Sequence, residues 1–595
     1  MAKYETLVKI LDQIRAEGAS AGYTSYAPTT DDTEAVNQAR SKAYVHLFHK
    51  VKFGLLSFSD REKFITDGPQ DGGVDGYFID EDSKVITFLQ SKFRTTEKNF
   101  ESKQITLDEI ASMDIARITS GYETNEDGVE YSGKIKGLIR NIAAIEDIGR
   151  YKYRVIIIAN LRDASQTTLR NLTGGFAVEI FDSERCYSEL VFPVLSGTYF
   201  QKGDLSILID VSNKSAGARV TYGVSTVYGD CDITVLFVAT LEIAKIMYRY
   251  KNAILKYNPR SYLEFEGAPV NLAIRESILS SSSNEFALLN NGITMISDQT
   301  NISERIGQKN KAQLVVTNPQ IINGGQTAYT LSRILESDAA NVEAIFGGKE
   351  VLLKVITLNA PEQSYNSEKS KQLIDKISTA TNRQTAVTNT DRYSNEEGFL
   401  VLQKAIFDRF GVLFERKRGE FGDGVRDGYL DRDQILERNV FAKIFFAANG
   451  RIPDGGVRRS FLRLINPEEI ATRSHELDRF YFCYRAYLSL GRPALNKRNR
   501  ATVMRLYAFT SVFFSRGLDA AEKTGNIEAF HREWESFLSV RSAAPKPSRS
   551  VRKQRALEGE GVPPDNPNLT PHKSIKDEID EYFASSPLHP SNLDT

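Results

Sequence analysis

Three absences narrow the classes of protein to which this sequence can belong. Its 595 residues include only three cysteines, Cys186, Cys231 and Cys483, which are too widely spaced for a disulfide framework and fit a reducing cytoplasm. No stretch approaches the roughly 18 uninterrupted apolar residues that a membrane-spanning helix needs. No Gly-x-x-x-x-Gly-Lys-Ser/Thr loop is present, which excludes a P-loop ATPase or helicase. We therefore expect a cytoplasmic protein that does not span a membrane.

The chain also lacks an excess of charge of either sign. Its 76 basic and 77 acidic residues give a formal net charge of −1. A surface that binds phosphate groups must therefore come from local clusters of Lys and Arg rather than from the overall charge. The length allows about two to four domains, each large enough for its own core.

One segment carries most of the chemical information. Residues 71–77 read Asp-Gly-Gly-Val-Asp-Gly-Tyr, and residues 90–92 read Gln-Ser-Lys. Alternating polar and apolar residues predict a strand over 74–80, and β-rich composition predicts a second strand over 85–93. The polar residues 81–84 between them predict a turn. We therefore expect a β-hairpin.

The register of this hairpin brings three functional groups together. A turn centred at residues 82–83 places Asp75 directly opposite Gln90, with Cβ atoms about 5 Å apart. The same register places Gly73, which has no side chain, opposite Lys92. Side chains two apart on a strand point to the same face, so Gln90 and Lys92 project together. A carboxylate, an amide oxygen and an ammonium group are thus expected to converge.

This convergence suits hydrolysis of a phosphodiester bond. Mg²⁺ or Mn²⁺ prefers oxygen ligands, for which Asp75, the amide oxygen of Gln90 and the backbone carbonyl of Ser91 are candidates. Lys92 is the candidate for orienting the attacking water or stabilising the developing negative charge. The alternative interpretation is an ordinary edge hairpin with a polar outer face, because each of these residue pairs is common by itself.

With these motifs, residues 71–76 and 89–93 resemble the PD-(D/E)xK fold of Mrr-type restriction endonucleases in its Gln-x-Lys variant. The resemblance implies a catalytic glutamate on the helix before the hairpin, and the helical run 32–51 offers Glu34. Glu34 equally suits a role in capping the start of that helix. The sequence departs from many members of the family at Gln90, where they have an acid, and the lost negative charge weakens the expectation of tight metal binding.

The order of expected elements predicts the fold class. The expected elements follow the order helix, hairpin, strand (153–161), helix and strand (177–181). This is the order of a mixed sheet flanked by helices. We expect an α/β and α+β multidomain protein whose segments are a PD-(D/E)xK nuclease-like domain (1–190), a central α+β domain (191–430), a helical region (431–540), a basic linker (541–573) and a short C-terminal helix with its tail (574–595).

Five segments between residues 258 and 420 resemble, in combination, the abortive-infection phage-resistance (AIPR) family. The resemblance covers roughly residues 230 to 480 and implies a bacterial antiviral role, but it implies no catalytic assignment. The segments are Asn-Pro-Arg-Ser-Tyr-Leu (258–263), Leu-Leu-Asn-Asn-Gly-Ile-Thr (288–294), Asn-Pro-Gln-Ile-Ile-Asn-Gly-Gly-Gln-Thr (318–327), Thr-Asn-Arg-Gln-Thr (381–385) and Phe-Glu-Arg-Lys-Arg-Gly-Glu (414–420).

Amide and cationic side chains in these segments can hydrogen-bond to phosphates and base edges. Two adjacent glycines that open a helix indicate close approach of another group, and the helix start offers an anion site. The alternative is that the amides cap turns and the charges form a solvated face. The candidate nucleic-acid or phosphate ligands are Asn323, Gly324, Gly325, Gln326, Thr327, Asn382, Arg383, Arg416, Lys417 and Arg418.

These observations favour a metal-dependent DNA endonuclease whose second domain grips nucleic acid or senses an invader. We expect double-stranded DNA as the substrate and a homodimer as the active form, because two copies related by a two-fold axis can cut both strands. A phage-derived trigger or a partner protein is left unidentified. Two alternatives stay open: a nucleic-acid-binding module with an inactive nuclease fold, and a sensor of nucleotides or second messengers.

Overall fold

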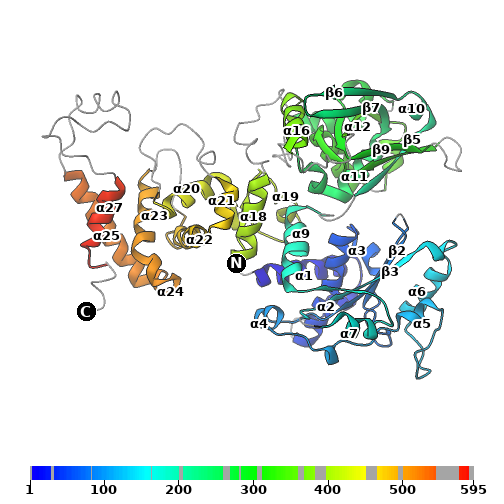
Figure 1. Cartoon of the computed structure of the whole chain (residues 1–595), viewed down its shortest axis with the longest axis horizontal. Coiled ribbons are helices and arrows are strands. Elements are labelled where there is room, and N and C mark those ends of the chain that lie inside the picture. Colours follow the sequence, from blue (N-terminus) through cyan, green and yellow to red (C-terminus); the bar gives the residue numbers. More distant parts are fainter. Residues whose placement is uncertain are drawn as a thin grey trace. The chain divides into compact units, whose positions relative to one another are not determined.

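The computed structural model divides the chain into two compact units (Figure 1). Unit 1 comprises Met1–Asn395 and Phe407–Ile435, and unit 2 comprises Glu396–Ile406 and Leu436–Thr595. The structure describes residues 3–28, 32–81, 83–161, 164–199, 205–258, 269–280, 283–303, 311–338, 340–358, 368–381, 397–417, 419–450, 466–492, 500–543 and 575–588. The mixed α/β and α+β architecture predicted from the sequence is confirmed.

The N-terminal part of unit 1 is built on a four-stranded mixed sheet of order β1-β2-β3-β4. Its strands are β1 (Gly76–Asp80), β2 (Val85–Ser91), β3 (Lys152–Ile158) and β4 (Val178–Phe181). β1 and β2 form the expected antiparallel hairpin, whereas β2, β3 and β4 run parallel. The functional groups expected from the sequence therefore lie at one end of a hairpin that is anchored in a larger sheet.

The apolar run in β3 is buried on both faces of this sheet, as its composition predicts. Val155 and Ile157 join one core, which also contains residues of α6 (Gly133–Ala143). Ile156 and Ile158 join a second core with residues of α1 (Lys3–Ser20) and α2 (Thr33–Lys52). Successive side chains of a strand point to opposite faces, so a strand covered by helices on both sides must be apolar throughout.

Further helices complete this part of unit 1. The polar side chain of Asp32 caps the start of the long helix α2 by accepting a hydrogen bond from the Ala35 backbone N–H at 3.0 Å. The helices are α1 (Lys3–Ser20), α2 (Thr33–Lys52), α3 (Phe58–Glu62), α4 (Glu97–Glu101), α5 (Ile115–Thr119), α7 (Gln166–Leu172), α8 (Ser183–Cys186), the π-helix η4 (Tyr187–Val191) and α9 (Phe192–Ser196).

The central part of unit 1 contains two more sheets, of order β11-β8-β12-β7-β6 and β5-β10-β9. Residues of α11 (Thr240–Tyr250) and α14 (Gly325–Ser337) share one core with strands of both sheets. The strands are β5 (Ser206–Ser212), β6 (Val220–Thr226), β7 (Gly229–Ala239), β8 (Ile293–Ser297), β9 (Gln299–Ser303), β10 (Lys311–Thr317), β11 (Gln320–Asn323) and β12 (Glu350–Leu358). The other helices are α10 (Asn213–Gly217), α12 (Pro269–Ser280), α13 (Phe286–Leu289), α15 (Val342–Phe346) and α16 (Glu368–Thr381).

A late segment of unit 1 returns to the N-terminal core. Phe421, in the loop before α19 (Gly422–Arg426), Tyr429 and Leu430 pack in the same core as α1, α2 and α9. The buried ammonium group of Lys50 on α2 also contacts the Tyr429 hydroxyl and forms an ion pair with Glu17 at 3.0 Å. The core that contains α2 is thus completed by residues almost 400 positions later in the sequence.

The described part of unit 2 is mainly helical. Phe530, Trp534 and Phe537 lie on one face of α25 (Thr524–Ala543) and are buried in a core with residues of α22 (Ser474–Ser489) and α23 (Arg500–Phe513). α18 (Glu397–Phe410) begins in unit 2 and ends in unit 1, and the remaining helices of unit 2 are α20 (Arg438–Ala448), α21 (Pro467–Thr472), α24 (Leu518–Ala521) and α27 (Ile575–Ala584).

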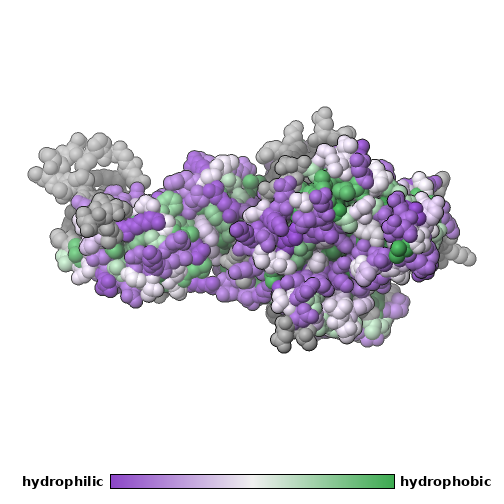
Figure 2. Space-filling view, turned by 90° about the horizontal axis from the view of Figure 1, so that it is seen from below, coloured by the Kyte–Doolittle hydropathy of each residue, from purple (hydrophilic) through white to green (hydrophobic). Residues whose placement is uncertain are grey.

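The described helices bear on the expectation that no helix spans a membrane. Hydrophilic residues predominate on the face of the molecule shown in Figure 2. Among the described residues, every helix is too short or too polar to span a bilayer. All three cysteines are buried and free of disulfides, as their spacing predicts.

Candidate active site

The hairpin has the register that the sequence predicts. Gly76 pairs with Leu89 and Asp80 pairs with Val85, and the Asp75 backbone N–H donates to the Leu89 carbonyl at 2.9 Å. The regular pairing ends at Gly76 and Leu89, so Asp75 and Gln90 lie next to the last pair of the hairpin. The Ser91 backbone N–H also donates to Asp75 Oδ2 at 2.6 Å, which fixes the orientation of this carboxylate.

Two further carboxylates, which the sequence analysis did not assign, lie beside Asp75. One oxygen from each of Asp67, Asp71 and Asp75 falls within 4.8 Å of the others. These residues are spaced four apart in the sequence, and this Asp-x-x-x-Asp-x-x-x-Asp pattern was the signal that could have identified them. The site therefore holds more negative charge than Asp75 alone provides.

Hydrogen bonds and two glycines shape the loop that carries these carboxylates. Asp71 accepts the backbone N–H groups of Gly73 at 2.9 Å and Gly68 at 3.2 Å. Gly72 and Gly73 have φ angles of 61° and 74°, a left-handed conformation that favours glycine. A Cβ atom on Gly73 would lie 2.4 Å from the Ser112 carbonyl oxygen, so this position also requires the absence of a side chain.

Gln90 is buried, with only 1% of its surface exposed, and its amide is half satisfied. Its Nε2 atom donates to the carbonyl oxygens of Gly73 at 2.8 Å and Ala111 at 3.1 Å. The opposite amide orientation would face Oε1 toward two carbonyl oxygens, so these contacts determine which atom is which. Within the described residues, Gln90 Oε1 has no hydrogen-bond partner. Such a buried acceptor is costly unless a cation or donor meets it.

The electrostatics of the site follow from its crowded carboxylates. Burial and the neighbouring Asp67 and Asp71 raise the pKa of Asp75 to about 7, although the Ser91 N–H and Lys92 act in the opposite direction. Burial also raises the pKa of Asp67, which Lys42, Lys134 and Lys92 oppose. The group therefore binds positive charge, either a proton or another cation, more readily than exposed aspartates do.

Lys92 lies where the sequence predicts it. Its backbone N–H donates to the Ile158 carbonyl at 2.9 Å, which continues the pairing of β2 with β3, and its side chain is half-buried. Its positive charge opposes the rise in the pKa values of both Asp75 and Asp67. The structure thus brings Asp75, Gln90, Ser91 and Lys92 together at the end of one hairpin.

Glu34 is not placed with this group. It lies in the first turn of α2, exposed to solvent, and it is not one of the three clustered acids. It is eight residues before Lys42, the residue of α2 that interacts with Asp67, which corresponds to about 12 Å along a helix. The catalytic interpretation of Glu34 therefore finds no support in the geometry, whereas a place in the first turn of the helix agrees with the alternative.

The glycine pair of the central domain is explained by packing within the chain. Gly324 has a φ of 82°, and a Cβ atom there would lie 2.7 Å from the Gly292 carbonyl oxygen. A Cβ atom on Gly325 would lie 2.9 Å from the side-chain nitrogen of Asn258. The group that approaches these glycines is thus the protein itself, and no ligand is needed to account for them.

The neighbouring polar residues of this turn also have partners within the chain. The Asn323 side chain accepts a hydrogen bond from the Gly324 backbone N–H at 2.7 Å. Thr327 is buried and accepts one from Asn290 at 3.2 Å. Gln326 is half-buried at the start of α14. The amide-capping alternative therefore accounts for Asn323 and Thr327.

The interpretation of Arg416 and Lys417 as phosphate ligands is corrected by their burial. Only 7% of Arg416 and 3% of Lys417 are exposed. Arg416 forms an ion pair with Glu420 at 2.9 Å. Lys417 Nζ donates to backbone carbonyls of Lys256 at 2.7 Å and Asn258 at 2.9 Å. Arg418, Asn382 and Arg383 lie outside the described residues.

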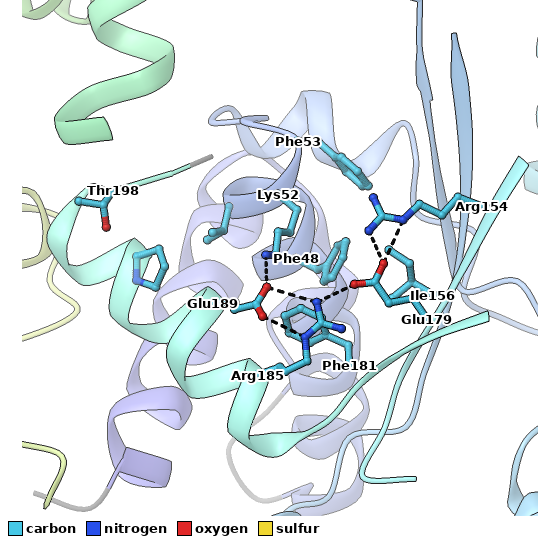
Figure 3. A pocket seen from close by; sticks show the side chains of 12 residues that line it. Phe48, Lys52, Phe53, Arg154, Ile156, Glu179, Phe181, Arg185, Glu189 and Thr198 are labelled. Carbon is cyan, nitrogen blue, oxygen red and sulfur yellow. Dashed lines mark hydrogen bonds and ion pairs between the residues drawn. The ribbon is translucent and has the colours of Figure 1, made fainter. Parts of the chain in front are cut away.

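A separate pocket lies at the end of α2, and its charges neutralise one another (Figure 3). It is lined by the end of α2, by β3 and β4 and by the helical segment that follows them. Its charged side chains form one alternating series, in which Arg154 contacts Glu179, Glu179 contacts Arg185 at 2.6 Å, Arg185 contacts Glu189 at 3.0 Å, and Glu189 contacts Lys52 at 2.6 Å. Because each charge is met by an opposite charge, the hairpin is the stronger candidate for chemistry.

Comparison with known proteins finds a family match for the middle of the chain. The model of the AIPR protein family matches residues 255–445. None of the curated proteins and none of the solved structures that were compared matches the chain. The matched segment contains the Gly324–Gly325 turn and Lys417 but not the hairpin, so the nuclease interpretation rests on the hairpin motif and its geometry.

Proposed function

We propose that this protein is a metal-dependent endonuclease that hydrolyses phosphodiester bonds of double-stranded DNA in bacterial defence against phages. The observation that carries the proposal is the convergence of Asp75, Gln90 and Lys92 at the end of one hairpin. Anionic and neutral oxygens beside an ammonium group are suited to a substrate that is itself an anion and that gains negative charge during hydrolysis.

The donor atoms fit a hard divalent cation such as Mg²⁺ or Mn²⁺. The set consists entirely of oxygens, and one of them, Gln90 Oε1, is buried without a partner among the described residues. Asp75, Gln90 Oε1 and the backbone carbonyl of Ser91 would hold the cation. A bound cation of this kind neutralises charge on the phosphate and lowers the pKa of water.

The chain's own groups would perform distinct tasks. The Ser91 N–H holds Asp75 Oδ2, which leaves the other carboxylate oxygen directed elsewhere and fixes the side chain before substrate binds. Lys92, the residue after Ser91, would donate hydrogen bonds to a phosphate oxygen or to the attacking water. Gly73 does not leave the open space that the sequence predicts opposite Lys92, because the Ser112 carbonyl and the Gln90 amide lie against it.

The proposed role in phage defence rests on the match of residues 255–445 to the AIPR family model and on the motifs in that segment. We further propose that the active form is a homodimer, because a duplex has two antiparallel strands and one site cuts one strand. The AIPR-like segment would then sense an invader, through a phage-derived trigger or a partner protein, or would grip nucleic acid.

The test is cleavage of plasmid DNA by the full-length protein with Mg²⁺ or Mn²⁺. We expect Lys92→Ala to lower the cleavage rate by about 10²- to 10³-fold, as for loss of one group that stabilises a transition state. Lys98→Ala is the matched control, because Lys98 is an exposed lysine on the nearby helix α4. It should leave the rate unchanged.

A wild-type protein that binds DNA but cuts it with neither metal would contradict the proposal. It would favour the alternative of a nucleic-acid-binding module with an inactive nuclease fold. Equal loss of activity in Lys92→Ala and Lys98→Ala would assign the effect to general weakening of DNA binding, because both variants remove one positive charge.

A further inference from the structure

We infer that Asp67 and Asp71, together with Asp75 and the side-chain oxygen of Gln90, form a single site for one divalent cation. The inference deepens the proposed function and rests on its metal dependence. It adds two carboxylates to the hairpin residues, and it places part of the site on the loop before β1 rather than on the sheet.

The first argument is the count of charges. Gln90 is neutral, so the hairpin itself offers a cation only the single negative charge of Asp75. The affinity of a divalent-cation site depends on how many charged oxygens surround it. Asp67 and Asp71 bring the number of carboxylates from one to three, all with an oxygen within 4.8 Å of the others. The acid that is absent from position 90 is thus replaced by acids that reach the site from the loop.

The second argument is the position of the unpartnered oxygen. Asp75 and Gln90 are the residues next to Gly76 and Leu89, the last pair of the hairpin, and the Asp75 carboxylate accepts the N–H of Ser91, the residue after Gln90. The amide nitrogen of Gln90 is held by the Gly73 carbonyl at 2.8 Å, and Gly73 lies in the loop between Asp71 and Asp75. The buried head group of Gln90 therefore sits against the carboxylate loop, with Oε1 left without a donor in the described structure.

The third argument is that no basic side chain among the described residues pairs directly with the three carboxylates. Among the described residues, none of the three carboxylates has a Lys, Arg or His nitrogen within 4.0 Å. Lys42, Lys92 and Lys134 act on the cluster only at longer range, and Lys134 is already paired with Glu62 at 3.0 Å. The cluster therefore keeps a negative charge that a small, doubly charged ion can neutralise.

The loop holds the acids in place without using all of their oxygen lone pairs. Asp71 accepts two backbone N–H groups, one on each oxygen, and Asp75 accepts one. A carboxylate has about four acceptor positions, so each side chain can still ligate an ion. The backbone N–H groups of Thr66 and Asp67 both donate to the Asp75 carbonyl at 3.0 Å, which ties the first acid to the third.

The experiment is titration of the metal-free full-length protein with MnCl₂, followed by the electron paramagnetic resonance signal of free Mn²⁺. We expect the wild type to bind one ion per chain. Asp67→Asn should weaken binding by roughly tenfold or more, because one attractive charge is lost without a change of shape. Asp75→Asn should weaken it at least as much. Glu81→Gln, at an exposed acid in the turn of the same hairpin, should leave the affinity unchanged.

Asp71→Asn is a second test. The unfolding temperature of this variant must be measured as well, because Asp71 also holds the loop through two backbone hydrogen bonds. Affinity in Asp67→Asn equal to that of the wild type, or wild-type protein that binds no Mn²⁺ at millimolar concentrations, would overturn the inference. Mn²⁺ binding that depends on Asp67 in a protein that leaves plasmid intact would keep the site and remove the nuclease proposal. Metal-dependent cleavage that is unaffected by Asp67→Asn would keep the nuclease and remove Asp67 from the site.

Discussion

Unit 1 contains two pairs of consecutive glycines, Gly72–Gly73 in the loop before β1 and Gly324–Gly325 at the start of α14. The polar groups that lie beside the two pairs differ. In both loops a glycine has a left-handed conformation, and another part of the chain occupies the space of its missing side chain. The difference lies in the polar groups left over. Beside Gly73, three carboxylates form no ion pair among the described residues. The buried amide oxygen of Gln90 there has no hydrogen-bond donor either. Beside Gly324, the side chains of Asn323 and Thr327 have partners within the chain.

The comparison teaches that a glycine pair reports close approach but not what approaches. The sequence favoured a ligand at Gly324–Gly325 because two glycines at a helix start are costly. The structure shows that the carbonyl of Gly292 and the side chain of Asn258 take that space. A functional site is better recognised by polar atoms that remain without partners after folding.

The largest effect should follow from neutralising the central acid of the hairpin site. We expect Asp75→Asn to reduce metal-dependent DNA cleavage by about 10³-fold or more, because it removes the carboxylate at the end of the hairpin that lies beside Asp67 and Asp71. Asn323→Ala, at the second glycine loop, should change the rate by less than about threefold, within the range of a surface substitution. Initial rates of plasmid nicking measure both. Equal losses in the two variants would show that both loops serve catalysis.

Alanine in the two loops should separate a structural cost from a functional one. Both Gly73→Ala and Gly324→Ala should lower the free energy of unfolding by about 2–4 kcal/mol, because each adds a methyl group at positive φ against a backbone carbonyl. Only Gly73→Ala should also weaken Mn²⁺ binding, measured below the unfolding temperature of both variants. Wild-type Mn²⁺ affinity in Gly73→Ala would show that the loop does not shape the site.

The stability of the metal-free protein should fall as pH rises if the acids are crowded. The pKa of Asp75 is raised to about 7 in the folded protein, above its value in the unfolded chain. Its contribution is therefore fully present below about pH 4 and is lost as pH rises through 7. Asp75→Asn should consequently be more stable than the wild type by about 2 kcal/mol at pH 8 and not at pH 4. Thermal unfolding in EDTA at the two pH values measures this difference. A destabilised Asp75→Asn protein at pH 8 would show that its hydrogen bond with Ser91 dominates.

The buried lysine of the AIPR-like segment should affect stability without affecting DNA binding. Lys417→Met removes hydrogen bonds to backbone carbonyls, and burial already holds the pKa of Lys417 well below its usual range. We expect a loss of about 1–3 kcal/mol in stability, which is typical when buried acceptors lose a donor. The salt dependence of DNA affinity should be unchanged, because Lys417 does not reach a phosphate. A flatter salt dependence would return Lys417 to the binding surface.

The smallest effect should come from Glu34. Because Glu34 is exposed in the first turn of α2 and lies apart from the clustered acids, Glu34→Ala should change the cleavage rate by less than about twofold and stability by less than about 0.5 kcal/mol. The same plasmid and unfolding measurements apply. A loss as large as that of Asp75→Asn would restore the catalytic role that the family resemblance implies.

Much of the hairpin could be predicted because its rules are local. The strands, the turn and the two-residue alternation of side chains follow from neighbouring residues, so the pairing of Gly76 with Leu89 and of Asp80 with Val85 could be counted from the turn. The burial of β3 on both faces could likewise be predicted from its apolar run. The proximity of Asp67 and Asp71 to Asp75 could not be predicted with the same certainty, because their four-residue spacing marks them as candidates but does not fix the path of the loop.

The sequence by itself determined the mixed helix-and-strand architecture and the hairpin register from Gly76 to Leu89, because these depend on local periodicity and on composition. Only the tertiary structure decided which polar groups remain without partners. The path of the Asp71 loop is held by distant residues, since the Gly72 carbonyl accepts from the Asp114 N–H at 2.9 Å and Gly73 lies against Ser112. Lys417 likewise has its ammonium group on carbonyls about 160 positions earlier in the chain. Contacts over such distances depend on how whole elements pack, and they determine whether a charged side chain meets a ligand or the protein itself.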